Sequence, residues 1–299
     1  MLFIGVPASV VIFLKGLLMG MADIVPGVSG GTMALITGIY ERFIRALSSI
    51  NFRFIPRRVK GDKKGAKESW ASIDWAMLVP LFIGILSAMV IFARVIDYLL
   101  DNFAGPTYAF FFGLILASAG FVYKYVEHLD TRHILSGLIG FLMVVVVIGI
   151  EEITNNHSLP ILFISGAIAV CAMILPGISG SLTLLILGQY EYFLEALNKG
   201  SWKDLIAFAA GAIVGILAFA RLLNWLLKHH RSVTMAFLFG CMLGALRLPG
   251  EIIMAETDPS SVTSVALVVI AAVFGFAGVF VLERRSDRIK DRLGIEMDR

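Results

Sequence analysis

Charged residues are scarce in this chain, and their scarcity excludes a soluble globular protein. Asp, Glu, Lys and Arg make up only 16% of the 299 residues, while hydrophobic residues make up 58%. An ordinary soluble domain has about 25% charged residues. Because a membrane-spanning helix needs roughly 20 mostly apolar residues, the composition provides for about six to eight such segments. The formal net charge of +3 is too small to indicate nucleic-acid binding, so we expect membrane lipids and no nucleic acid as partners.

Cysteine and histidine are also scarce, which excludes the sites that they usually build. The two cysteines, Cys171 and Cys241, lie in apolar stretches, so we expect neither a disulfide framework nor a cysteine metal site. The five histidines fall in predicted loops and lack the spacing of metal ligands on a helix. We therefore expect no metal and no cofactor.

Long apolar runs, by contrast, are abundant and are of two kinds. Six are unbroken and are predicted to span the membrane: 75–100, 106–123, 134–150, 203–227, 232–248 and 262–282. Two longer stretches, 6–47 and 160–197, are interrupted by Pro-Gly, at Pro26 and Gly27 and at Pro176 and Gly177. Proline removes a backbone donor and ends a helix. Each stretch is therefore predicted to be a re-entrant pair of half-helices, hinged at its Pro-Gly break.

The two broken stretches are copies of each other. Residues 13–47 align without a gap with residues 163–197, and nearly half of the positions are identical. The helices that follow also match, for example in the Phe-Ala-Arg of 92–94 and of 219–221. A basic loop at 48–74 accounts for the greater length of the first half. The chain is thus predicted to consist of two structural repeats.

Each predicted repeat crosses the membrane an odd number of times, because three spanning helices follow a pair that crosses zero times or twice. The two repeats must then have opposite orientations, an arrangement typical of secondary transporters. We predict an all-α polytopic membrane protein with two inverted-topology repeats, each a re-entrant pair plus three transmembrane helices. The first repeat, the second repeat and a basic cytoplasmic tail are predicted at 1–150, 151–282 and 283–299.

The positions of lysine and arginine support this topology. If both broken pairs are re-entrant, most of the 25 basic residues lie on one side of the membrane. They fall in the segments 42–70, 121–133, 228–231 and 283–299. Because basic loops mark the cytoplasmic side, both chain termini are predicted to be cytoplasmic.

The segments at the two breaks are candidate phosphate-binding sites. They read PGVSGGT at 26–32 and PGISGSLT at 176–183. A helix N-terminus presents unpaired amides and partial positive charge, which attract phosphate, and hydroxyl side chains add donors. The candidate residues are Ser29, Gly30, Gly31, Thr32, Ser179, Gly180, Ser181 and Thr183. The alternative interpretation is that these segments only cap helices and allow close packing.

Two arginines within the apolar runs are further candidates, because charge inside a membrane is costly. Arg94 and Arg221 occupy equivalent positions of the two repeats. A guanidinium group binds phosphate through two parallel hydrogen bonds. The alternative is that both side chains extend to the membrane surface.

Three acidic residues are candidates for proton coupling. Asp23 precedes the first break and could neutralise Lys15, carry a proton or cap the following turn. Glu41 and Glu191 lie in matched Gly-x-Tyr-Glu segments. A carboxylate buried among apolar groups binds a proton more readily, but both glutamates could equally be solvated helix ends.

At these residues the sequence resembles the polyprenyl-phosphate transporter family, undecaprenyl-phosphate translocases of bacteria and archaea that were long a family of unknown function. The matching stretch is GLLMGMADIVPGVSGGTMALITGIYERFI, residues 16–44, with the second Pro-Gly-Ile-Ser-Gly-Ser copy. The resemblance covers essentially the whole chain. The family's motif residues correspond to Asp23, Pro26, Gly27, Ser29, Gly30 and Gly31, and in the second copy to Pro176, Gly177, Ser179 and Gly180.

This resemblance implies a flippase, not an enzyme, that returns undecaprenyl phosphate from the outer to the inner leaflet of the bacterial cytoplasmic (inner) membrane. One alternative is a membrane undecaprenyl-diphosphate phosphatase, since those enzymes share inverted repeats and a Pro-Gly-x-Ser motif. Arginine follows the serine in those enzymes, whereas Gly30 and Gly180 stand there in this chain, which disfavours hydrolysis. A small-anion carrier is another alternative. A homodimer is compatible with the sequence, but no motif specifies it.

Overall fold

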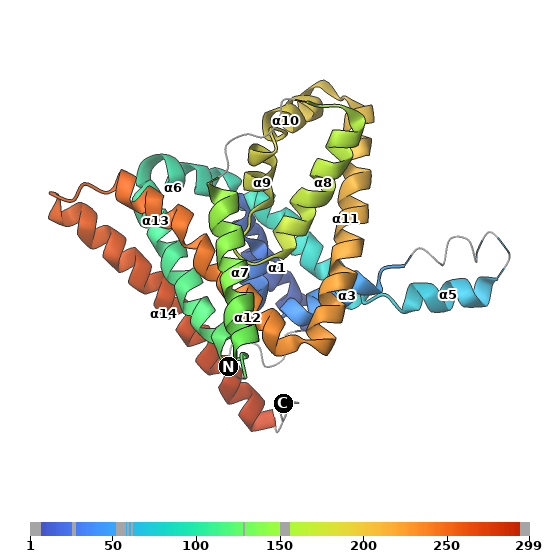
Figure 1. Ribbon diagram of the computed structural model, residues 1–299, viewed down its shortest axis with the longest axis horizontal. Helices are drawn as coiled ribbons and strands as arrows, with labels where there is room; N and C mark the ends of the chain where they lie inside the picture. The colour runs from blue at the N-terminus through green and yellow to red at the C-terminus, as the bar shows by residue number, and fades with distance from the viewer. Residues whose placement is uncertain are drawn as a thin grey trace.

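The computed structural model describes residues 7–25, 28–51, 58, 60, 62–127, 129–149 and 156–293, and side chains as far as 281. Every regular element within these ranges is an α-helix (Figure 1). In the first half these are α1 (Ala8–Ile24), α2 (Gly30–Ile36), α3 (Tyr40–Ser49), α5 (Lys63–Ala71), α6 (Trp75–Tyr123) and α7 (Thr131–Ile148). In the second half they are α8 (Leu159–Ile174), α9 (Gly180–Ile186), α10 (Tyr190–Lys199), α11 (Trp202–His229), α12 (Arg231–Ala245), α13 (Arg247–Glu256) and α14 (Val262–Leu293).

The predicted runs 75–100 and 106–123 are the two arms of the long helical element α6, which is kinked in the gap between them, at Phe103, without a loop. Phe103 has non-helical backbone angles, φ −141° and ψ 42°, and Pro106 follows it without an amide donor. The 49 residues of α6 extend about 73 Å at 1.5 Å per residue, more than twice the roughly 30 Å of a bilayer core. Each arm is therefore long enough to cross by itself; we call 75–102 the first arm and 104–123 the second arm.

Five helical segments of the described chain are long and apolar enough to cross a membrane: Trp75–Tyr123, Thr131–Ile148, Trp202–His229, Arg231–Glu256 and Val262–Val281. The fourth joins α12 to α13 and so extends beyond the predicted run 232–248. Helix α14 continues to Leu293, into the region predicted to be a tail. The chain is accordingly a multi-pass membrane protein.

The helices on either side of each break fold back as a hairpin. In the second half, the Gln189 side chain at the start of α10 contacts the segment just before α8: its Nε2 donates to the Asn156 carbonyl at 3.1 Å, and its Oε1 lies 3.0 Å from His157 Nδ1. In the first half, Lys15 Nζ on α1 donates to the carbonyl of Thr37 after α2 at 2.6 Å. Both pairs therefore form hairpins, and Figure 1 places α10 at the top of the bundle and α3 in its lower part.

The same turn ends both hairpins. Gly38 and Gly188 have φ angles of 69° and 63°, in the left-handed region that glycine adopts without strain. The amides of Gly38 and Ile39 bond to Leu35 and Ala34 carbonyls, as those of Gly188 and Gln189 bond to Leu185 and Leu184. The Gly-x-Tyr-Glu segments thus have one local structure in both halves.

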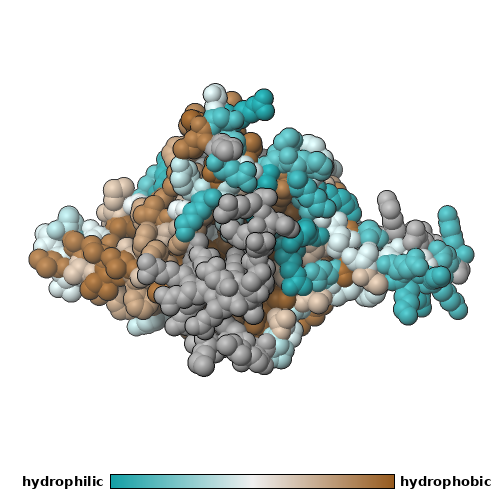
Figure 2. Space-filling model, turned by 90° about the horizontal axis from the view of Figure 1, so that it is seen from below, coloured by the Kyte–Doolittle hydropathy of each residue, from teal (hydrophilic) through white to brown (hydrophobic). Residues whose placement is uncertain are grey.

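The basic loop predicted at 48–74 contains a helix. Helix α5 projects sideways from the bundle (Figure 1) and forms a hydrophilic extension in the view from below (Figure 2). Its lysines Lys63, Lys64 and Lys67 are exposed.

Close backbone contact joins the first hairpin to α6 and the second hairpin to α11. A Cβ atom at Gly84 on α6 would collide with the Phe13 carbonyl on α1. A Cβ at Gly211 on α11 would collide with the Phe163 carbonyl on α8. Since these two pairs occupy equivalent repeat positions, the halves pack their hairpins in the same way, through small residues that let helices approach.

We predict that Gly84→Ala and Gly211→Ala each destabilise the protein by about 1–3 kcal/mol, because each added methyl group overpacks a backbone contact. The measurement is the thermal unfolding midpoint in detergent. Gly120→Ala on α6 is the matched control, since a Cβ there meets nothing within 4 Å; it should leave the midpoint unchanged or raise it. Equal midpoints for all three variants would contradict the packing described.

Candidate functional site

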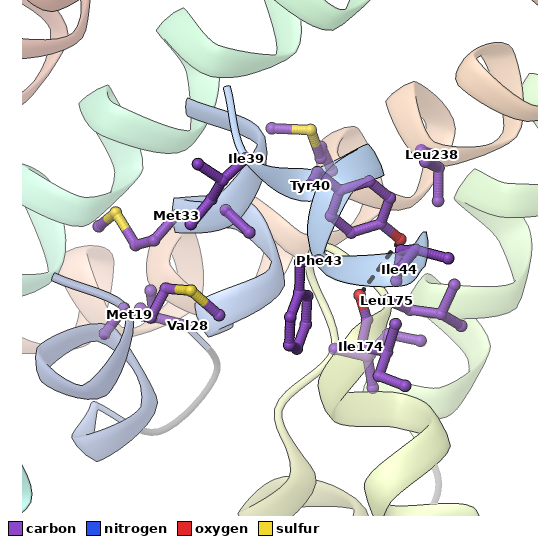
Figure 3. Packing of buried hydrophobic residues seen from close by; sticks show 14 of the residues in the cluster. Met19, Val28, Met33, Ile39, Tyr40, Phe43, Ile44, Ile174, Leu175 and Leu238 are labelled. Atoms are coloured by element: carbon purple, nitrogen blue, oxygen red, sulfur yellow. Dashed lines mark hydrogen bonds between the residues drawn. The ribbon is translucent and has the colours of Figure 1, made fainter. Parts of the chain in front are cut away.

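The two Pro-Gly breaks meet inside the bundle. Ser29 Oγ at the first break donates to the Leu175 carbonyl at the second break, at 3.0 Å. In return, the Gly177 amide donates to Thr32 Oγ1 at 3.1 Å. Tyr40 at the start of α3 donates its hydroxyl to the Ile174 carbonyl at 3.3 Å (Figure 3). These residues are buried, so the breaks satisfy each other's polar groups where water is absent.

Glycine permits this close contact at both breaks. Gly177 has a φ of 89°, and a Cβ there would lie 2.7 Å from the Cys241 carbonyl on α12. A Cβ at Gly31 would lie 2.6 Å from the Ile174 carbonyl. The predicted hinge at Pro176 and Gly177 is buried at this contact, whereas Pro26 and Gly27 lie outside the described residues.

At the first break, two amides at the N-terminus of α2 already donate to nearby side chains. Asp23 Oδ1 accepts from the Gly30 amide at 2.7 Å, and Ser29 Oγ accepts from the Gly31 amide at 3.1 Å. Of the roles predicted for Asp23, the structure therefore shows the cap. A carboxylate stands where the sequence predicted a bound anion, and the partial positive charge of a helix start favours it there.

The second break differs in its polar groups. Met173 occupies the position of Asp23, and Ser179 makes no side-chain cap bond to α9. Instead, Ser179 Oγ lies 2.8 Å from Ser181 Oγ, and Thr183 Oγ1 donates to the Ser179 carbonyl at 2.9 Å. Ser179 and Thr183 are buried, while Ser181 is half-buried. A pair of hydroxyl groups therefore lies at the start of α9, and no carboxylate among the described residues bonds to them.

The structure does not bring the two arginines to the breaks. Arg221 Nη2 donates to the Ile50 carbonyl, at the end of α3, at 2.8 Å. Arg94 is exposed and has no hydrogen bond or ion pair with any described residue. The prediction that both arginines extend the phosphate site thus gains no support from their contacts.

The two matched glutamates have different surroundings. Glu41 pairs with Arg231 on α12 at 2.9 Å and with Arg45 at 3.7 Å, whereas Glu191 is exposed. The sequence analysis missed Arg231, because nothing local in the chain indicates that the starts of α3 and α12 meet. It also gave no role to Tyr40, although that residue lies in the matched Gly-x-Tyr-Glu segment.

Broken hairpins that meet within a bundle of long apolar helices define a polytopic membrane protein. A family model described as undecaprenyl phosphate translocase-like matches residues 19–276, and the chain belongs to this family. No solved structure matches it.

Two relatives extend over most of the chain, and both are named polyprenyl-phosphate transporter. The protein from Vibrio cholerae is 41% identical over 238 residues, 78% of this chain and 75% of the relative. The protein from Staphylococcus aureus is 34% identical over 264 residues, 81% of this chain and 88% of the relative. These names are those of transporters, not of enzymes.

The contact between the breaks predicts a specific loss of stability. Thr32→Val keeps the side-chain shape but leaves the buried Gly177 amide without its acceptor, at a cost of about 1–3 kcal/mol. Thr183→Val is the matched control, because that hydroxyl bonds only within its own turn. Thermal unfolding in detergent should show the larger loss for Thr32→Val, and a larger loss for Thr183→Val would refute the predicted role of this bond.

Proposed function

We propose that this protein transports polyprenyl phosphate across the bilayer and that its substrate is undecaprenyl phosphate, returned from the outer to the inner leaflet of the bacterial cytoplasmic membrane. The names of the two relatives support the substrate class. The observation that carries the proposal is the buried contact between the two breaks, because it concentrates polar groups within an apolar bundle. The transport would return the lipid carrier for reuse in peptidoglycan synthesis.

The chemistry of a lipid monophosphate fits such a bundle. Its anionic head needs hydrogen-bond donors to leave the membrane surface, because an unpaired charge in hydrocarbon is costly. Its isoprenoid tail needs no shelter, since the lipid-facing sides of the helices are apolar. The protein therefore has only to shield the head.

We place the phosphate head at the breaks. In the second break, Ser179, Gly180, Ser181 and Thr183 supply hydroxyl groups and close backbone approach. In the first break, Ser29, Gly30, Gly31 and Thr32 face the same contact, where the bound Asp23 carboxylate indicates that an anionic group is accommodated. The head would bind next to the second break first, and would reach the Gly30 amide only when Asp23 moves away.

Movement of the head between leaflets requires that the site opens to each side in turn. Two repeats of opposite orientation, with both termini cytoplasmic, would provide two related states for this purpose. Protonation of Asp23, Glu41 or Glu191 would couple the exchange to the proton gradient. A homodimer remains a prediction that the contacts within one chain neither require nor oppose.

Leaflet-specific detection of undecaprenyl phosphate in proteoliposomes, with and without a pH gradient, tests the proposal. The double variant Ser179→Ala, Ser181→Ala should bind the lipid roughly 10- to 100-fold more weakly, because it loses hydrogen bonds to a charged group. Ser118→Ala is the control: that buried hydroxyl bonds within α6, to the Leu114 carbonyl. If the wild-type protein moves no lipid, the proposed function is wrong; if it moves only soluble phosphate, the protein is a small-anion carrier.

A second prediction concerns Asp23. Asp23→Asn keeps an acceptor for the Gly30 amide but removes the titratable charge, so stability should fall by no more than about 1 kcal/mol. If Asp23 carries the coupling proton, this variant should still exchange lipid between leaflets, but a pH gradient should no longer accelerate the exchange. An unchanged response to the gradient would exclude Asp23 as the coupling group.

A further inference from the structure

The helices that follow the two hairpins are copies in sequence but differ in packing. On α3, the side chains of Tyr40, Ile44 and Leu47 are 2%, 0% and 1% exposed. At the equivalent positions of α10, Tyr190, Leu194 and Leu197 are 36%, 42% and 51% exposed. Helix α3 is thus docked on its apolar face, and the same face of α10 has no comparable cover.

Contacts with the second half hold the docked helix at both ends. At its start, Tyr40 bonds to the Ile174 carbonyl and Glu41 pairs with Arg231. At its end, the Arg221 guanidinium on α11 donates to the Ile50 carbonyl, the C-cap of α3. A cation at a helix C-terminus also interacts favourably with the helix dipole.

The repeat equivalents of Arg221 and Ile50 are not bonded to each other. The equivalent of Arg221 is Arg94, on the first arm of α6, which has no hydrogen bond or ion pair within the described chain. The equivalent of Ile50 is Gly200, the C-cap of α10, whose carbonyl accepts from the Trp202 amide at 2.8 Å. One contact has no equivalent: Ala104 stands where the second half has Arg231.

We infer that Arg221 and Arg94 are alternate clasps, of which Arg221 holds α3 docked in one state of the carrier and Arg94 holds α10 docked in the other. This inference rests on the proposed function, because it assigns the two states that transport requires. In the second state, Tyr190, Leu194 and Leu197 pack against the first arm of α6 and the Arg94 guanidinium donates to the Gly200 carbonyl. The arginines are then positioning residues that select a state, and the phosphate is bound by the breaks alone.

The ion pair between Glu41 and Arg231 makes the two states unequal. It stabilises only the state with α3 docked, because Glu191 has no arginine at the equivalent of Arg231. A ligand shifts such an equilibrium only through different affinities for the two states. The lipid head therefore has to bind the second state better in order to release α3.

Reciprocal thiol labelling in nanodiscs tests the inference. The reporters are Leu47→Cys on α3 and Leu197→Cys on α10, made separately in a Cys171→Ser background; Cys241 is 0% exposed and should stay unlabelled. Arg221→Gln should speed labelling of the Leu47→Cys reporter and slow that of the Leu197→Cys reporter, each by up to roughly tenfold for one charged hydrogen bond. Arg94→Gln should change both rates in the opposite directions.

Control variants test whether the labelling changes come from the hydrogen bonds of Arg221 and Arg94. Arg221→Lys and Arg94→Lys keep the cationic donor and should restore much of the wild-type labelling, whereas Arg132→Gln, at an exposed position on α7, should change neither rate. Changes of the same sign for both arginine variants, or no change, would overturn the inference.

Binding of undecaprenyl phosphate distinguishes this inference from the proposed function. Because the lipid binds the second state better, the two variants should change the apparent affinity in opposite directions: Arg221→Gln should tighten binding and Arg94→Gln should weaken it. If both variants weaken binding while the wild type still transports, the arginines are phosphate ligands; the inference then fails and the proposed function stands. Failure of the wild type to move lipid would refute the proposed function itself.

Discussion

The hydrogen bonds between the two Pro-Gly breaks are the constraint on which the rest of the structure depends. Proline and the turn interrupt the helices and expose backbone groups that a bilayer cannot solvate. The first break supplies the side-chain partners for two backbone groups of the second break: a serine donor for the Leu175 carbonyl and a threonine acceptor for the Gly177 amide. The hairpins must therefore meet, and the long helices pack around that contact.

The two copies have diverged where they meet. Asp23 in one break is Met173 in the other, and Thr32 is replaced by Leu182. The first break is consequently satisfied by its own side chains, while the second presents a pair of serine hydroxyl groups at the start of α9. The two sequence copies thus form breaks with different polar groups, and in the proposed function the second break binds the phosphate head.

Much of the fold could be predicted from the sequence, because its signals are local. Apolar runs and Pro-Gly pairs predicted the helices and the breaks, and the matched Gly-x-Tyr-Glu segments end in the same turn in both halves. The kink at Phe103 lies in the gap between the predicted runs 75–100 and 106–123. The sequence did not predict that helical structure continues on both sides of this residue without a loop.

The site was harder to predict than the fold. Symmetry of the sequence favoured equal roles for Arg94 and Arg221, but the structure places only one of them at a helix end. Of the three roles open to Asp23, only tertiary structure shows the cap, since the aspartate and the Gly30 amide meet across the break. Charged residues at the surface of a bundle make contacts with residues far away in the sequence, as Arg221 does with Ile50 and Arg231 does with Glu41, and no local pattern encodes these contacts.

The most direct test of this account is an experimental structure of the protein in a lipid nanodisc with undecaprenyl phosphate bound. The account predicts density for the phosphate group at the contact between the breaks, within hydrogen-bond distance of Ser179 or Ser181, with the isoprenoid chain lying against the outside of the bundle. Phosphate density at a distance from both breaks would contradict it.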